Sequence, residues 1–289
     1  MFNINYINIM INISYQRETN TFLVESLDLG IIQHLLPLRV DFIDIVTGDI
    51  GYSAELSSNS WISWKGAEII HDIKIFTNKG TLLQESKWDV SQRGDSIERA
   101  LWFYLTNRKN QNIASNGLVI GTHDGRNGHW IYAVKENITR ATLIEGSANQ
   151  FSKLKNNYQH LNNVRMINTI VTTNGQDVTW YSGGEGYYDT VIAGQIDDWV
   201  SKDDLKVTNR SSKSINQIMS EDDFDWLHLD VEGIDDDLVY CLDKLPNLII
   251  YECLNFELER IKNLNTFLEN KGYVIIESAG NVMALKPEL

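Results

Sequence analysis

The feature that most constrains this chain is a repeated pattern that begins near Gly117. Short apolar segments alternate with glycine-rich or acidic loops and with amphipathic segments of helical periodicity. This alternation is typical of a parallel sheet whose faces are covered by helices. The segments expected to form strands are residues 118–122, 141–145, 164–171, 226–231, 248–253, 273–278 and 281–286. We therefore expect an α/β domain over residues 117–289.

The last two of these strands are separated only by Ala279 and Gly280. A parallel connection needs about a dozen residues or more, whereas two residues are enough for a hairpin. The sequence therefore predicts a mostly parallel sheet that ends in an antiparallel C-terminal hairpin. The polar stretch at residues 201–216 lacks the apolar pattern and is expected to form a loop.

The first third of the chain has a different pattern. Over residues 21–86 the apolar residues form short alternating or β-branched runs, separated by glycine, asparagine and serine. This pattern predicts a small β-rich module over residues 1–90. Apolar residues then recur at helical spacing over residues 94–105, so residues 91–116 are interpreted as a connecting helix and linker.

Charge and composition exclude several classes of protein. The chain has 25 Lys and Arg against 39 Asp and Glu, and this net charge of -14 would repel nucleic-acid phosphates. No apolar run approaches the ~20 residues that span a bilayer. The residues before Arg17 lack the parts of an export signal, and the two cysteines, Cys241 and Cys253, suit reduced thiols. We therefore expect a cytoplasmic protein that binds neither nucleic acid nor membrane.

A glycine-rich turn follows the first expected strand of the α/β domain. It has the sequence Gly121-Thr-His-Asp-Gly-Arg-Asn-Gly128 and leads into a helix. Glycines let the backbone approach a ligand, and amides at a helix start can bind that ligand at the carboxyl edge of the sheet. The alternative is a tight strand-to-helix turn that binds nothing.

The second expected strand ends in Glu145, 17 residues beyond Gly128. A carboxylate at this place can accept hydrogen bonds from both hydroxyls of a ribose. The combination of a glycine-rich turn with this acid is more specific than either part, and it indicates a ribose-binding site. A solvated acid at the end of a strand is the alternative.

A second group of polar residues surrounds the end of the fourth expected strand. Its members are His228 within the strand, Asp230 at its carboxyl end, Glu232 just after it, and Glu252 at the end of the following strand. Acids at this position could orient or deprotonate a hydroxyl group. Alternatively, the acids could stabilise a helix start and His228 could be a core residue. A Mg²⁺ site formed by Asp230, Glu232 and Glu252 is conceivable but is not the expectation, because the acids lie on different loops and no local spacing supports one.

Further motifs accompany these residues, namely FDWLHLDVEGIDDDLV at residues 224–239, IIYE at residues 249–252 and the terminal hairpin. Together with the turn and Glu145, they resemble the S-adenosylmethionine-dependent methyltransferases of the FkbM family over about residues 115–286. In that family the first strand usually ends in Asp-x-Gly-Ala-Asn-x-Gly, a pattern from which Thr122 and His123 depart. The resemblance implies a Rossmann-like methyltransferase sheet.

The resemblance also implies the cofactor and its contacts. S-adenosyl-L-methionine would be lined by Gly121, Asp124, Gly125 and Gly128, with its ribose held by Glu145 and its adenine near Asn168. The expected reaction is O-methylation of a small-molecule or carbohydrate hydroxyl. Asp230 and Glu232 are the expected proton acceptors, and His123 is the next candidate.

Two other classes of function stay open. The turn also resembles that of NAD(P)-dependent short-chain oxidoreductases, and Tyr240 and Lys244 have that family's catalytic spacing. These two residues follow the Asp230 loop, however, and no suitably placed serine strand precedes them. The third hypothesis is a non-catalytic binding or assembly protein. In that hypothesis the β-rich module would be the working part, whereas in the methyltransferase it is expected to contribute to substrate binding or to homo-oligomer formation.

Overall fold

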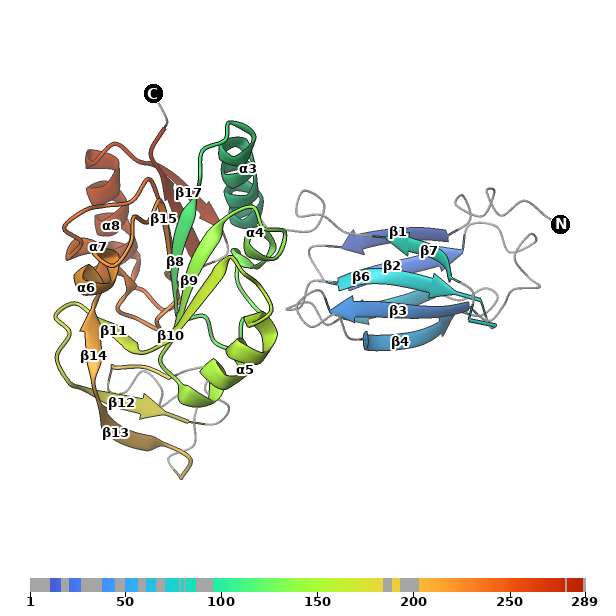
Figure 1. Cartoon of the computed structure of the whole chain (residues 1–289), viewed down its shortest axis with the longest axis horizontal. Helices are drawn as coiled ribbons and strands as arrows, with labels where there is room; N and C mark the ends of the chain where they lie inside the picture. Colours follow the sequence, from blue (N-terminus) through green and yellow to red (C-terminus); the bar gives the residue numbers. More distant parts are fainter. Residues whose placement is uncertain are drawn as a thin grey trace. The chain divides into compact units, whose positions relative to one another are not determined.

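The structure is a computed structural model of the chain. It describes residues 11–16, 21–26, 38–44, 50–56, 61–65, 71–77, 79–80, 82–86, 96–183, 189–192, 203–278 and 280–287. The chain divides into two compact units, Met1–Gly94 and Asp95–Leu289 (Figure 1). The two units contain different kinds of sheet.

The first unit contains two antiparallel sheets, with the strand orders β1-β2-β5 and β4-β3-β6-β7. Their strands are β1 (Ile11–Gln16), β2 (Thr21–Ser26), β3 (Leu38–Asp44), β4 (Ile50–Leu56), β5 (Trp61–Lys65), β6 (His71–Phe76) and β7 (Leu82–Ser86). Leu38, Val40 and Phe42 lie two residues apart on β3 and are fully buried, as expected for a strand with one face on a core. The prediction of a β-rich N-terminal region is confirmed.

The second unit is built around a seven-stranded sheet of order β10-β9-β8-β15-β16-β18-β17. Its strands are β8 (Asn116–Ile120), β9 (Arg140–Glu145), β10 (Val164–Asn168), β15 (Trp226–Leu229), β16 (Leu248–Glu252), β17 (Val274–Ser278) and β18 (Asn281–Leu285). Strands β8, β9, β10, β15 and β16 are parallel, whereas β18 is antiparallel to both of its neighbours. The predicted Rossmann-like sheet with an antiparallel C-terminal hairpin is therefore confirmed.

The order in which strands join this sheet reverses at its centre. From β8 the chain adds β9 and then β10 on one side, and it later returns to add β15 and β16 on the other side. Ile120 and Leu229 are the last residues of the two adjacent central strands, β8 and β15. In open α/β sheets, ligands bind outside the carboxyl ends of the strands at such a reversal.

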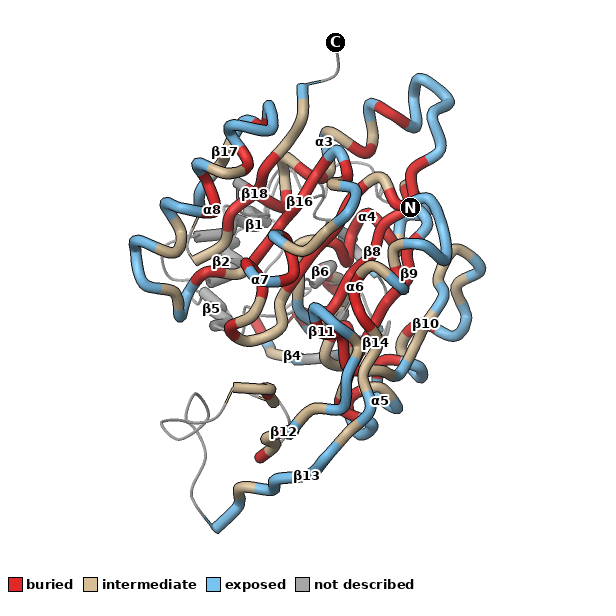
Figure 2. Tube along the Cα trace, turned by 90° about the vertical axis from the view of Figure 1, so that its left-hand side faces the viewer, coloured by how far each residue is buried: buried red, intermediate tan, exposed pale blue. Residues whose placement is uncertain are grey.

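Helices cover both faces of the sheet, with α3, α4 and α5 on one side and α6, α7 and α8 on the other (Figure 1). Their bounds are α3 (Ser96–Asn110), α4 (Ile131–Lys135), α5 (Ala148–Tyr158), α6 (Ile215–Met219), α7 (Asp235–Tyr240) and α8 (Leu258–Asn270). The buried residues follow the central strands (Figure 2). Leu227 and Leu229 of β15 pack in the core with residues of α6, α7 and α8. None of the helices in the described ranges is long and apolar enough to cross a membrane.

Two parts of this unit differ from the sequence-based prediction. The expected strand at residues 164–171 is divided, because the chain leaves the sheet after β10 and forms β11 (Ile170–Thr172), which pairs with β14 (Ser212–Ser214). The prediction of a loop at residues 201–216 is wrong for residues 206–210. They form β13 (Lys206–Arg210), which pairs with β12 (Val178–Ser182). β13 is largely exposed and polar, so it carries no apolar alternation that would signal a strand.

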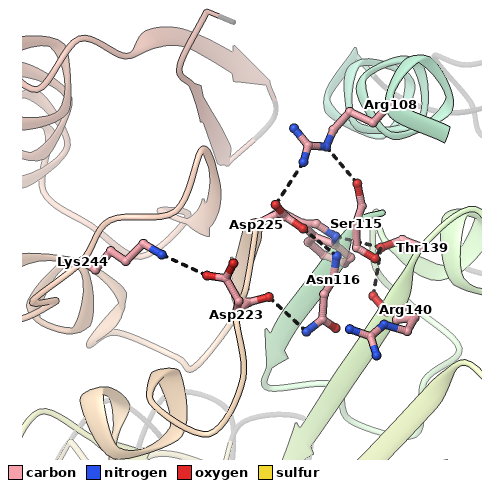
Figure 3. A network of polar contacts seen from close by, with 9 residues as sticks. Arg108, Ser115, Asn116, Thr139, Arg140, Asp223, Asp225 and Lys244 are labelled. Carbon is pink, nitrogen blue, oxygen red and sulfur yellow. Dashed lines mark hydrogen bonds and ion pairs between the residues drawn. The ribbon is translucent and has the colours of Figure 1, made fainter. Parts of the chain in front are cut away.

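A buried arginine fastens α3 to the sheet (Figure 3). Arg108 donates to Ser115 Oγ at 3.0 Å and forms an ion pair with Asp225 at 3.0 Å. The second Asp225 carboxylate oxygen accepts a hydrogen bond from the Asn116 backbone amide at 2.9 Å. Asn116 begins β8 and Asp225 precedes β15, so this network joins α3 to the amino ends of the two central strands. The helix interpreted from sequence as a connection belongs to the second unit.

Replacing Arg108 with Met should lower the free energy of unfolding by about 3 kcal/mol, because Asp225 keeps its charge but loses its buried partner. Urea denaturation followed by tryptophan fluorescence would measure the change. The control is Lys244→Met, which breaks an exposed ion pair with Asp223 and should cost less than about 1 kcal/mol. Equal losses in the two variants would show that the Arg108 network does not hold α3 on the sheet.

Candidate active site

The two groups of residues singled out from the sequence lie at one edge of the sheet. The glycine-rich turn follows β8, Glu145 ends β9, Asp230 follows β15 and Glu252 ends β16. These four strands are parallel neighbours, so their carboxyl ends point to the same edge. The fold therefore brings the predicted ribose-binding group and the predicted acidic group to the strand reversal.

Gly121 sets the distance between the loops that follow β8 and β15. Its φ is +80°, and a Cβ atom added to it would lie 1.6 Å from the carbonyl oxygen of Asp230. The Asp230 amide also donates to the carbonyl of Ile120 at 3.0 Å. Any side chain at Gly121 would collide with the Asp230 backbone, so glycine is required here for close packing.

The rest of the turn is fastened to the C-terminal end of α5. Gly125 has a φ of +76°, and a Cβ atom there would lie 2.4 Å from the Tyr158 ring. The Tyr158 hydroxyl donates to the Gly125 carbonyl at 2.6 Å, and Asn157 donates to the Asp124 carbonyl at 2.8 Å. Gly128 follows at the end of the turn, before α4. The small residues predicted to line a cofactor thus also let the turn pack tightly on the protein.

Glu145 is a buried acid with two backbone donors. One carboxylate oxygen accepts from the His123 amide at 2.7 Å and the other from the Ser147 amide at 2.6 Å. Burial raises the pKa of Glu145 to about 7, although these two hydrogen bonds oppose the shift. The alternative of a solvated strand-end acid is therefore wrong, since Glu145 is only 7% exposed.

Asp124 and His123 form a second polar pair in the turn. Burial would raise the pKa of Asp124, but hydrogen bonds from the His123 side chain and the Arg126 amide outweigh it, so the pKa is lowered. His123 Nδ1 lies 3.4 Å from the Asp124 carboxylate. Asp124 is consequently ionised at neutral pH, whereas Glu145 titrates there.

Asn168, the last residue of β10, is hydrogen-bonded to the backbone at the end of β9. Its side-chain amide donates to the carbonyl of Glu145 at 2.7 Å and to that of Gly146 at 3.3 Å. Both of its donor hydrogens are thereby directed at the backbone, and the Asn168 residue is exposed. A ligand at this edge could contact only the oxygen of the amide.

Three carboxylates meet at the ends of β15 and β16. Asp230, Glu232 and Glu252 each place an oxygen within 4.8 Å of the others' oxygens. The strand register pairs Leu229 with Tyr251, so the next residues along, Asp230 and Glu252, follow side by side. The sequence-based reason against a metal site was that these acids lie on different loops. That reason does not hold, because adjacent strands bring the loops together.

Burial and mutual repulsion keep these acids weak. Burial raises the pKa of Glu232 to about 7, and the charge of Asp230 raises it further. Burial also raises the pKa of Asp230, against the influence of His129 and His123. The pKa of Glu252 rises most, because burial is reinforced by the other acids. The raised pKa values therefore favour a protonated carboxyl within the cluster at neutral pH.

A pair of histidines that the sequence did not connect lies on the α4 side of the sheet. His129 Nδ1 lies 3.3 Å from His228 Nε2. Burial, together with the charge of His129, lowers the pKa of His228 to about 3, so this ring is neutral. The expectation of a core histidine is confirmed by its 2% exposure. In the sequence, His129 is marked only by its place directly after Gly128, at the end of the glycine-rich turn.

Asp189 and Thr190 also approach the site, and no motif marked them. Thr190 Oγ1 donates to the carbonyl of Glu232 at 3.0 Å. The Asp189 carboxylate accepts from the Gly183 amide at 3.3 Å, and its charge contributes to the raised pKa of Glu145. Thr190 therefore contacts the loop that carries Glu232, and Asp189 influences Glu145. Their position depends on the segment after β12, which the sequence did not predict.

No family model matches the sequence, and no curated protein matches it either. Among solved structures, the chain is similar to a putative caffeoyl-CoA O-methyltransferase from Staphylococcus aureus, with 13% identity, a TM-score of 0.38, and coverage of 68% of this chain and 95% of that one. An O-methyltransferase from Bacillus cereus in complex with SAH has 13% identity, a TM-score of 0.36, and coverage of 66% and 91%. A precorrin-6y C5,15-methyltransferase from Geobacter metallireducens has 13% identity, a TM-score of 0.34, and coverage of 65% and 86%.

The raised pKa of Glu145 predicts a measurable effect of pH on folding. In the unfolded chain this acid has its ordinary pKa of 4.5, and in the folded chain about 7. Its contribution to stability is therefore fully present below pH 4.5 and is lost as pH rises through 7, by about 3 kcal/mol. Glu145→Gln should flatten the pH dependence of the free energy of unfolding between pH 5 and 8.

Urea denaturation at several pH values would compare this variant with the wild type. The control is Glu136→Gln, a change at an exposed residue that should leave the slope unaltered. Identical slopes for wild type and Glu145→Gln would mean that Glu145 ionises as freely as in water.

Proposed function

We propose that the second unit is an S-adenosyl-L-methionine-dependent methyltransferase, a member of the FkbM family, that methylates a hydroxyl of a small molecule or carbohydrate. The observation that carries this proposal is Glu145. It is a buried carboxylate at the end of β9, beside the glycine-rich turn that follows β8 and at the strand reversal. A carboxylate in this place is suited to bind the two hydroxyls of a ribose.

The residues present fit the proposed cofactor. Each Glu145 oxygen accepts one backbone hydrogen bond and keeps a lone pair for a ribose hydroxyl. Asp124, whose pKa is lowered, is suited to the ammonium group of the methionine part. The oxygen of the Asn168 amide accepts no hydrogen bond from the described residues and could accept one from the adenine amino group.

The acidic cluster supports transfer to oxygen. When bound, the cofactor would supply an electrophilic methyl group, whose bond to sulfur would break as its bond to the acceptor oxygen forms. The chain's own residues would orient the acceptor hydroxyl and take up its proton as the carbon–oxygen bond forms. Glu232, with a pKa of about 7, is suited to accept a proton at neutral pH, and Asp230 lies beside it. His123 stays the next candidate, although its Nδ1 already faces Asp124.

The oxidoreductase alternative is not supported by the positions of Tyr240 and Lys244. Tyr240 is at the end of α7, where its ring packs edge-on against Phe267 at 5.1 Å. Lys244 pairs with Asp223. Asp223 lies at the amino edge of the sheet, where its carbonyl accepts from Asn116 (Figure 3). Neither residue lies near the glycine-rich turn, because the turn follows β8 at the carboxyl edge of the sheet.

The choice of acceptor rests on charge. A net charge of -14 opposes binding of nucleic acid, so a small molecule or carbohydrate is the favoured class. We assign to the N-terminal β module a contribution to acceptor binding or self-association. The third hypothesis, a non-catalytic binding protein, would be supported if the cofactor bound and no acceptor were ever methylated.

Cofactor binding tests the proposal directly. Isothermal titration calorimetry with S-adenosylhomocysteine should give saturable binding, whereas NAD and NADP should give none of comparable strength. Glu145→Gln should weaken binding by about 1.5–3 kcal/mol, because it removes a charged acceptor of two hydroxyl hydrogen bonds. Glu136→Gln, an exposed change, should have no effect. Binding of a dinucleotide alone would contradict the proposal.

Replacement of the two candidate proton acceptors should affect turnover more than cofactor affinity. Asp230→Asn and Glu232→Gln keep the shape of each side chain and remove its charge. With a panel of hydroxylated acceptors, each should reduce methyl transfer by roughly 10²–10⁴-fold while the dissociation constant for S-adenosylhomocysteine changes little. Full turnover in both variants would place the proton acceptor elsewhere, and His123→Asn would then be measured.

A further inference from the structure

The carboxylates of Asp230, Glu232 and Glu252 lie close together, and the positive influence on them comes from His129 and His123, which act on Asp230. Within the ranges that the structure describes, no Lys or Arg forms an ion pair with any of them. Arg260 pairs with Asp236 instead. The hydrogen bond that reaches the cluster comes from the Asn255 amide, at a long 3.4 Å from Glu232. The three carboxylates are half-buried and lie together, so a bound cation would offset the repulsion between them.

A buried, unpaired oxygen adjoins the cluster and supports the same conclusion. Asp235 is fully buried, and its Oδ1 accepts from the Val231 amide at 3.4 Å, in the loop between Asp230 and Glu232. Its Oδ2 meets no donor in the described part of the chain. Asp230 and Glu252 are the acids with which this carboxyl interacts electrostatically. A fourth acid thus interacts electrostatically with members of the cluster and has one oxygen without a hydrogen-bond partner in the described residues.

A buried histidine nitrogen completes the surroundings. His228 lies on β15, two residues before Asp230. His228 is 2% exposed, and its Nδ1 has no hydrogen-bond partner among the described residues. Because its pKa is lowered to about 3, the His228 ring is neutral and adds no positive charge near Asp230.

We propose that Asp230, Glu232 and Glu252 bind a divalent cation of the oxygen-preferring kind, such as Mg²⁺ or Mn²⁺. Oxygen ligands lie about 2.0–2.6 Å from such ions, so oxygens on opposite sides of one ion are ~4–5 Å apart. The separation of at most 4.8 Å between the three carboxylate oxygens fits that range. Three protein ligands leave coordination positions for water or for an oxygen of a second molecule.

The backbone holds two of these ligands in place. Asp230 is fixed by its hydrogen bond to Ile120 and by its contact with Gly121. Glu232 has a φ of +55°, and its carbonyl accepts from Thr190 Oγ1. The ligands are therefore positioned by the protein before the ion binds. In a role that rests on the proposed methyltransferase function, the cation would hold the acceptor oxygen. Asp230 and Glu232 would each bind the ion through one carboxylate oxygen and keep the other oxygen to accept the proton.

Binding of Mn²⁺ to the full-length chain tests the site without any turnover. Electron paramagnetic resonance of free Mn²⁺, in titrations of the EDTA-treated protein, should show one saturable ion per chain, displaced by excess Mg²⁺. Asp230→Asn and Glu252→Gln should each weaken this binding tenfold or more. Glu269→Gln, on the exposed end of α8, is the matched control and should bind like the wild type.

Circular dichroism of each variant would show that it is folded; the substitutions remove repulsion within the cluster, so the fold should persist. No saturable Mn²⁺ binding by the wild type, or equal binding by all four proteins, would overturn the proposal. A titration with S-adenosylhomocysteine in the presence of EDTA separates the two proposals. Cofactor binding without Mn²⁺ binding would refute the cation site alone, and the reverse result would refute the methyltransferase assignment alone.

Discussion

The site depends on the absence of a side chain at Gly121. Because the Asp230 carbonyl occupies the space that a Cβ atom would need, the loops after β8 and β15 meet in direct backbone contact. This contact places Asp230 beside the glycine-rich turn. The His123 amide of the same turn donates a hydrogen bond to Glu145. The close approach that Gly121 permits therefore brings Glu145 and the acidic cluster to the same part of the site.

Desolvation is the second constraint, and it acts on nearly every acid of the site. Burial raises the pKa values of Glu145, Glu232 and Glu252, whereas Asp124 is kept ionised by its hydrogen bonds. Neighbouring acids thereby differ in protonation at the same pH. Such differences suit a site in which one carboxylate must carry charge and another must exchange a proton.

The positions of the main site residues could be predicted because they depend on where strands end. The apolar pattern placed Glu145, Asp230 and Glu252 at the ends of parallel strands, and such ends share one edge. Which ends are neighbours depends on strand order, which local pattern does not determine. The contact between His129 and His228, the meeting of the carboxylates and the break between β10 and β11 were therefore not predictable.

The place of β18 determines the order in which the second unit can be completed. β18 follows β17 in the chain but lies between β17 and β16, so it forms both of the ladders that join β17 to the rest of the sheet. During synthesis, β17 cannot reach its final position until residues 281–285 have left the ribosome. The edge of β16 stays uncovered until then, and an uncovered edge can pair with other chains. Exposure to wrong pairing is therefore greatest in the last stage of translation of this unit.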